Sequence, residues 1–143
     1  MNIFYIGSPQ LFGEGASSIH VARMCEAFAE LGNDVELVLP IEIEEVDYFF
    51  SYYNVSNKFK INRTFGLKRG PLRHMLHGLL SFFKMFSVDN YDLIITRNIT
   101  FAYFASFFKP NIIVDIHHPA VNYLSKIAIK RFIKATNIVK ISC

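Results

Sequence analysis

The first forty residues place an apolar run, a glycine-containing loop, a helical pattern and a second apolar run in succession. Residues 2–6 are almost all apolar, as in a strand buried on both faces, and the second run covers 35–39. Between them, an apolar stripe of helical spacing leads to Gly32, a residue suited to stop a helix. This order predicts a βαβ unit, and therefore parallel strands in an open α/β sheet.

The remainder of the chain repeats this alternation of strands and helices. Helical patterns cover 71–86, 101–108 and 121–135, and the aromatic segment 41–57 is compatible with a surface helix. Further strands are expected at 58–65, 91–96, 111–116 and 138–141. We therefore predict one Rossmann-like α/β domain over 1–143, an open parallel sheet with helices on both faces. The chain ends directly after its last expected strand, so we expect it to stop short of a partner domain.

Composition and cysteine usage restrict the class of protein. No apolar segment reaches the roughly 20 residues that cross a bilayer. The N-terminus also lacks the basic region of a signal peptide, so we expect a cytoplasmic protein. Cys25 and Cys143 lie far apart without metal-type spacing and are expected to be free thiols. We expect neither a metal nor a cofactor.

Charge is divided unevenly along the chain. Residues 1–57 hold nine acids and one base, whereas residues 58–143 hold three acids and fourteen bases. This asymmetry favours an anionic partner beside the second half. Two alternatives stay open: the halves neutralise each other across the fold, or an acidic partner domain does so.

The segment Arg69–Phe86 concentrates bases within an apolar helical pattern. We expect one apolar stripe to face the sheet, made of Leu72, Met75, Leu76, Leu79, Phe83 and Phe86, with Leu80 and Phe82 outside it. The bases of this segment are Arg69, Arg73, His74, His77 and Lys84. Such a helix fits an anionic membrane surface, and the alternative is a sheet-covering helix with a solvated basic face. No nucleic-acid motif accompanies the bases, so we expect no nucleic-acid partner.

The loop after the first expected strand carries Gly13, Gly15, Ala16 and Ser17 at the start of a helix. Glycine lets the backbone approach a ligand closely, and a helix N-terminus attracts phosphate. The loop lacks the third glycine of the dinucleotide fingerprint and the lysine of a P-loop. It predicts an anion site, with a plain surface loop as the alternative. His20, one turn later, is a candidate to face the same crevice.

Polar residues also end two later strands. Arg97 and Asn98 follow one strand, and Asp115, His117 and His118 end the next. The carboxyl ends of parallel strands share one edge of the sheet, where ligands bind. Arg97 can bind a carboxylate or phosphate, or it can form a salt bridge with Asp115. His117 can bind a sugar hydroxyl or move a proton, or with His118 it can be a surface or helix-cap pair.

These motifs together resemble the N-terminal domain of family 4 glycosyltransferases of the GT-B fold. The resemblance covers nearly the whole chain, although Asp115 stands where the family often has glutamate. The matching segments, in chain order, are the strand and glycine loop at 3–17, the turn at 31–35, Asp92-Leu93-Ile94-Ile95-Thr96-Arg97, Asp115-Ile116-His117 and the final strand ending in Ser142. The resemblance implies one half of a GT-B fold.

The resemblance also implies a function and a set of site residues. It implies retaining transfer of a sugar from a nucleotide-sugar donor to a glycan or lipid-linked acceptor. The loop residues Gly13, Gly15, Ala16 and Ser17 would approach the donor phosphates, and His117 would be the catalytic residue on the transferred sugar. Contacts to acceptor or sugar would come from His20, Arg97, Asn98, Asp115 and His118.

The resemblance leaves half of the cleft to a second domain that would hold the main nucleotide site. The isolated chain is therefore expected to be inactive, and the intact enzyme to work in the cytoplasm, peripheral to the inner face of the membrane. Two other readings stay open. One is a nucleotide- or phosphate-binding Rossmann module, and the other is an inactive remnant that at most touches membranes.

Overall fold

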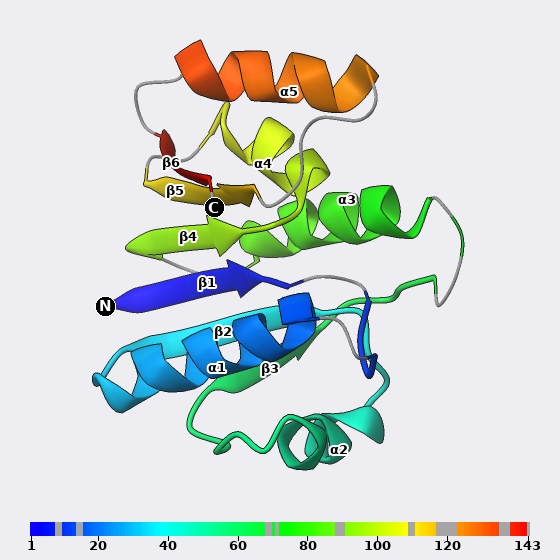
Figure 1. Cartoon of the computed structure of the whole chain (residues 1–143), viewed down its shortest axis with the longest axis vertical. Helices are drawn as coiled ribbons and strands as arrows, with labels where there is room; N and C mark the ends of the chain where they lie inside the picture. Colours follow the sequence, from blue (N-terminus) through cyan, green and yellow to red (C-terminus); the bar gives the residue numbers. More distant parts are fainter. Residues whose placement is uncertain are drawn as a thin grey trace.

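Six parallel strands form one sheet with helices on both faces, which confirms the predicted Rossmann-like α/β class (Figure 1). The computed structural model describes residues 1–7, 10–13, 16–67, 70, 72–87, 91–108, 111–116, 123–134 and 138–142. The elements are β1 (Asn2–Ile6), α1 (Ala16–Glu30), β2 (Asp34–Leu39), α2 (Glu45–Tyr52), β3 (Lys60–Arg63), α3 (Arg73–Met85), β4 (Leu93–Thr96), α4 (Ile99–Ala105), β5 (Ile112–Ile116), α5 (Tyr123–Lys134) and β6 (Ile138–Ser142).

The strand order is β3-β2-β1-β4-β5-β6. The chain moves outward from β1 to β3, returns to place β4 beside β1, and then moves outward in the other direction. The register pairs Ile3 with Val35 on one side and with Leu93 on the other. The strand order therefore reverses between β1 and β4, and ligands of open α/β sheets bind at such a point, outside the carboxyl ends of the strands.

Alternate residues of the strands supply two separate cores. Ile3 and Tyr5 pack with α1 and α2, whereas Phe4 and Ile6 pack with α3, α4 and α5. Because successive side chains of a strand point to opposite faces, almost continuous apolar strands are what a sheet covered on both faces requires. Cys25 of α1 is buried in the first core as a free thiol, as predicted, whereas Cys143 lies outside the described residues.

Helix α1 ends where its sequence predicts. Gly32 adopts a φ of 82°, a left-handed conformation that glycine adopts at low cost. The Gly32 N–H donates to the Ala29 carbonyl at 3.0 Å, and the Asn33 N–H donates to the Phe28 carbonyl at 3.2 Å. This pair of bonds is a Schellman motif. At the N-terminal end, α1 begins at Ala16, so Ser17 is its second residue.

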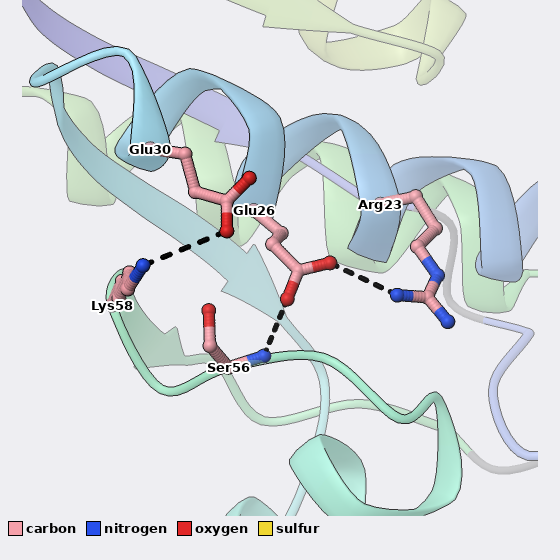
Figure 2. A network of polar contacts seen from close by, with 5 residues as sticks. All are labelled: Arg23, Glu26, Glu30, Ser56 and Lys58. Carbon is pink, nitrogen blue, oxygen red and sulfur yellow. Dashed lines mark hydrogen bonds and ion pairs between the residues drawn. The ribbon is translucent and has the colours of Figure 1, made fainter.

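The connection from α2 to β3 is held against α1 by polar contacts (Figure 2). The backbone N–H of Ser56 donates to Glu26 at 2.7 Å, and Lys58 pairs with Glu30 at 3.5 Å. The Ser56 N–H favours the charged carboxylate and so lowers the pKa of Glu26. Arg23 binds the second oxygen of Glu26 at 3.0 Å. These contacts fix the chain that follows α2 beside α1, and side chains of the aromatic segment 41–57 share a core with α1.

Helix α3 presents to the sheet a different face from the one predicted. His77, Gly78, Ser81, Phe82 and Met85 are its buried residues. Four residues of the predicted stripe are exposed instead: Leu72, Phe83 and Phe86 are 56, 66 and 53% exposed, respectively, and Met75 is also exposed. The other two, Leu76 and Leu79, are half-buried. The expectation was therefore wrong for these four exposed residues and for Phe82, which is buried. The inward face is chosen by fit, because small residues on it let α3 approach α4 closely.

The layers bear on one alternative for the charge asymmetry, neutralisation of the two halves across the fold. Helices α1 and α2 carry four carboxylates and one guanidinium, whereas α3, α4 and α5 carry six cations and no carboxylate. These layers lie on opposite faces of the sheet, so the helices do not neutralise each other. Lys58 and Lys60, which pair with Glu30 and Asp34, provide local neutralisation only.

Gly78 is the point of closest approach between α3 and α4. A Cβ at this position would overlap the Asn98 amide oxygen and would lie 2.9 Å from the Phe101 nitrogen. That amide oxygen accepts the Phe101 N–H and so caps α4. Glycine at 78 therefore serves both the packing of the two helices and the cap.

We expect Gly78→Ala to lower the free energy of unfolding by about 2–4 kcal/mol, because overpacking and a disturbed N-cap add. Urea unfolding at neutral pH measures this. Gly13→Ala is the matched control, since no described atom lies within 4 Å of its Cβ position, and it should change the free energy by less than about 0.5 kcal/mol. Equal losses in both variants would contradict the role given to Gly78.

Candidate functional site

The candidate site lies at the carboxyl ends of β1, β4 and β5, on either side of the point where the strand order reverses (Figure 1). The loop from β1 to α1 and the residues after β4 meet at this edge. Residues 117–122, which follow β5, lie outside the described residues, and so do 14–15. His117, His118 and Gly15 are among them, so their predicted roles stay predictions.

Arg97 connects three elements at this edge. Its Nε and Nη2 both lie 2.7 Å from Oδ2 of Asp115, at the end of β5. Its Nη1 donates to the carbonyl and the hydroxyl of Ser17, at 3.1 and 2.9 Å, in the first turn of α1. The side chains of Arg97 and Asp115 are only 8 and 12% exposed. We call this arrangement of Arg97, Asp115 and Ser17 the Arg97 junction.

The Arg97 junction shows how Arg97 is used. Of the two alternatives, the strand-end salt bridge to Asp115 is present. The guanidinium directs hydrogen bonds at Asp115 and Ser17, so it holds the start of α1 against the ends of β4 and β5. A buried arginine that is paired in this way positions the elements around it, and removing its partner would leave an uncompensated charge.

Asn98 has a structural task at the same edge. Its amide oxygen accepts the Phe101 N–H at 3.0 Å, and its amide nitrogen donates to the His74 carbonyl at 2.8 Å. The side chain therefore caps α4 and ties it to α3, and Asn98 is 5% exposed. Its predicted contact with an acceptor would have to compete with both bonds.

The described part of the glycine loop is held in place by aromatic packing. Phe12 packs on Tyr48, Tyr52 and Tyr53, and its N–H donates to the Tyr53 hydroxyl at 2.9 Å. Gly13 follows with a φ outside the left-handed region and with no described atom within 4 Å of its Cβ position. Neither backbone conformation nor crowding among the described residues requires glycine at 13, so both the anion site and the plain surface loop stay open as predictions.

Three of the predicted site residues lie at the start of α1, directly after this loop. Ala16, Ser17 and His20 are exposed, and no acid lies in the first turn of the helix. The first turn therefore offers backbone N–H groups and a partial positive charge and has no carboxylate of its own, although Glu14 precedes it in the sequence. Arg73, at the start of α3, donates to the Gln10 side chain at 3.3 Å and brings a further cation to the loop.

His77 was predicted as part of a basic face, but the structure buries it completely. Its Nε2 donates to the Gly7 carbonyl at 3.1 Å, because a carbonyl can only accept, and its Nδ1 lies 3.2 Å from the Thr64 hydroxyl. Burial is the main cause that lowers the pKa of His77 to about 4. The neutral imidazole thus ties the end of β1 to the chain that follows β3.

Tyr5 was missed as part of the site because it reads as an ordinary strand residue. It is buried near the Arg97 junction, and burial raises its pKa while the nearby Arg97 opposes that shift.

Among the described residues, no three His, Cys, Asp or Glu side chains come together as a metal site. No helix within the same residues is long and apolar enough to cross a membrane.

A double-mutant cycle tests the buried pair. We expect Asp115→Leu to cost about 3–5 kcal/mol of unfolding free energy because Arg97 is then buried without a counter-charge, and the double variant with Arg97→Met to cost less than this single variant. The exposed pair Lys58 and Glu30, changed to Met and Leu, is the control and should show a coupling below about 0.5 kcal/mol. Similar couplings for both pairs would refute the role of the junction.

Stability should fall in mild acid through His77. Its folded pKa of about 4 lies below the ordinary 6.5, so the unfolded chain binds the proton first as the pH drops. The contribution is present above pH 6.5 and is lost progressively toward pH 4. We expect a loss of about 2 kcal/mol between pH 7 and pH 5, measured by urea unfolding.

His77→Gln keeps a donor for Gly7 but cannot titrate, so it should remove most of this pH dependence. His20→Gln changes an exposed histidine and should leave the dependence intact. If both variants keep the wild-type dependence, another group is responsible for it.

Comparison with protein-family models and with curated proteins finds no match to this chain. The resemblance to family 4 glycosyltransferases therefore stays a prediction drawn from the motifs. Any proposed function must be compatible with the fold, the Arg97 junction and the glycine loop beside it.

Proposed function

We propose that this chain is the acceptor-side half of a GT-B glycosyltransferase, which moves a sugar from a nucleotide-sugar donor to a glycan or lipid-linked acceptor. The observation that carries the proposal is the Arg97 junction at the point where the strand order reverses. It brings the first turn of α1 and the ends of β4 and β5 into one wall. The predicted donor loop and the predicted sugar-binding histidine adjoin this wall in sequence.

The loop and α1 would stabilise the charge of the leaving diphosphate. The first turn of α1 lacks acids, and Gly13 leaves open space for a ligand that approaches the backbone. Preorganised N–H groups at a helix start stabilise developing negative charge without reorganisation. Arg73, held near the loop through Gln10, would add a cation.

The end of β5 would orient the transferred sugar. Arg97 holds Asp115, and His117 follows two residues later in the chain. A histidine so placed can hydrogen-bond a sugar hydroxyl or move a proton near neutral pH. Catalysis would then depend mainly on positioning and on charge stabilisation, with the main nucleotide site on a second domain. A lipid-linked acceptor would require the enzyme to work at the inner face of the membrane.

A nucleotide- or phosphate-binding module is the second candidate. The strand order favours it, because β3-β2-β1-β4-β5-β6 is the order of dinucleotide-binding domains. The loop argues against a dinucleotide, since it lacks the third glycine of that fingerprint. The two candidates differ in affinity: half of a cleft should bind a nucleotide sugar weakly, whereas a complete module should bind it tightly.

Titration of the isotope-labelled chain with UDP-glucose, followed by amide NMR, separates these candidates. The proposal predicts a Kd on the order of millimolar, because half of the contacts are missing, with shifts at Gly13, Ala16 and Ser17. Gly13→Val should weaken binding by about tenfold because a side chain then occupies the approach to the backbone. Saturation at micromolar concentrations would favour the nucleotide module instead.

The control for Gly13→Val is Asn57→Val, an exposed position in the connection from α2 to β3. It should leave both the affinity and the shifted residues unchanged. Shifts confined to other parts of the chain, with Gly13 and Ser17 unaffected at saturating ligand, would refute the donor role of the loop. Thermal melting of both variants should match the wild type.

A further inference from the structure

Exposed phenylalanine side chains gather where α3 and α4 end. Phe83 and Phe86 are more than half exposed, and so are Phe107 and Phe108 after the end of α4. The buried Phe82 lies beneath them, with ring centroids 5.7 Å from Phe83, 5.2 Å from Phe86 and 5.8 Å from Phe108. We call the exposed residues Phe83, Phe86, Phe104, Phe107 and Phe108 the aromatic face. A soluble surface rarely leaves aromatic rings gathered in this way without a partner.

The helix charges nearest to the aromatic face are cations. Lys84, Arg131 and Lys134 lie in the last turns of α3 and α5, and Lys130 and Lys134 are exposed. Asp92, just before β4, is the exposed acid described at this edge of the sheet. The guanidinium of Arg131 lies over the Phe107 ring, 3.4 Å from its centroid. The opposite layer, α1 and α2, holds four carboxylates. The cationic helices therefore lie on the side of the sheet that carries the aromatic face, and the acidic helices lie on the other side.

The face lies at the edge of the sheet opposite the Arg97 junction. Helices α3 and α4 start at the carboxyl ends of the strands and run back toward their amino ends (Figure 1). Phe83, Phe86, Phe107 and Phe108 come at or after the ends of these helices. A partner bound here would leave the crevice at the Arg97 junction open.

We propose that the aromatic face is a docking surface for an anionic lipid bilayer. Phenylalanine rings insert at the boundary between headgroups and acyl chains, and lysines beside them bind anionic headgroups. A second copy is disfavoured, because two such faces would bring the cations at the ends of α3 and α5 against the same cations of the other chain. The proposal goes beyond glycosyl transfer and does not depend on it, since any activity at the crevice is compatible with it.

This surface differs from the one that the sequence predicts. The predicted bases were those of Arg69–Phe86, but His77 is buried and Arg73 reaches the glycine loop. Arg69 itself lies outside the described residues. The cations of α5 take their place, because α5 packs on α4 and Arg131 donates to the Ser106 hydroxyl at 2.9 Å.

The absence of tryptophan from the chain allows a direct test. Phe83→Trp places a single fluorophore on the aromatic face, and Leu31→Trp places one at the end of α1, where the side chain is 79% exposed. With vesicles of phosphatidylcholine and about 30% phosphatidylglycerol, we expect a blue shift for the first variant only. Pure phosphatidylcholine vesicles should give little shift, and added salt should reverse the response.

Charge variants of the full 143-residue chain provide the quantitative test by vesicle co-sedimentation. Lys130→Glu with Lys134→Glu should lower the partition to anionic vesicles by about tenfold or more. Lys58→Glu with Lys60→Glu makes the same change in net charge on the other side of the molecule and should lower it much less. All four positions are exposed, so these variants should fold, as thermal melting can verify.

Three results would overturn the proposal. One is no binding of the wild-type chain to anionic vesicles, and another is equal loss in both charge variants. The third is a wild-type dimer that Phe83→Ser with Phe86→Ser converts to a monomer, since a second copy would then cover the aromatic face. Light scattering after size exclusion detects that dimer. Binding that needs anionic lipid and that fails only in the variants of the aromatic face and α5 supports the proposal.

Discussion

The buried ion pair of Arg97 and Asp115 is the contact on which the candidate site depends. The register of β4 and β5 pairs Thr96 with Val114, so the next step places the two charged residues beside each other. A slip of one residue would separate them and would also turn every side chain of β5 to the other face. Burial makes each charge costly alone, and the short contact offsets that cost only in this register. The pair therefore selects the strand alignment as well as holding the edge.

The same guanidinium also joins the two sides of the sheet. Asp115 belongs to a strand whose crossover helix, α4, covers one face, whereas Ser17 belongs to α1, which covers the other. At the point where the strand order reverses, the neighbouring crossovers leave in opposite directions and no helix spans the gap. A single arginine that binds both sides keeps this gap at a defined width. His77 also connects two segments, because its ring nitrogens bind the Gly7 carbonyl after β1 and the Thr64 hydroxyl after β3.

Much of the fold follows from the sequence, because a strand buried on both faces needs an unbroken apolar run. The runs at 2–6, 35–39 and 111–116 are of this kind, and each is a strand. The pairing of Arg97 with Asp115 was also accessible, since both residues end neighbouring expected strands. The bond to Ser17 was not, because it depends on how the loop from β1 delivers α1 to the edge.

Helix α3 shows where sequence periodicity fails. Helical spacing identifies an apolar stripe, but α3 has two candidate faces, and only fit against α4 and β1 decides between them. Gly78 allows the close approach, and the carbonyl of Gly7 and the hydroxyl of Thr64 satisfy a buried His77. Gly7 and Thr64 are distant from His77 in the sequence, and Gly78 has no apolar side chain that a periodicity could detect. Phe83 and Phe86, two residues of the predicted core stripe, were then left outside and belong to the aromatic face.

Under the two proposals, the two edges of the sheet would attract anions through different interactions. At the carboxyl edge, Asp115 neutralises Arg97, so attraction for a phosphate would come from the short-range dipole of α1 and from Arg73 near Gln10. The cations of α5 act over about 8 Å at physiological ionic strength, which reaches a surface in contact but not a ligand across the sheet. The arrangement can thus hold an anionic surface on one side while a small anion exchanges at the other. If the bases were spread evenly over both edges, the same cations would attract both the anionic surface and the small anion.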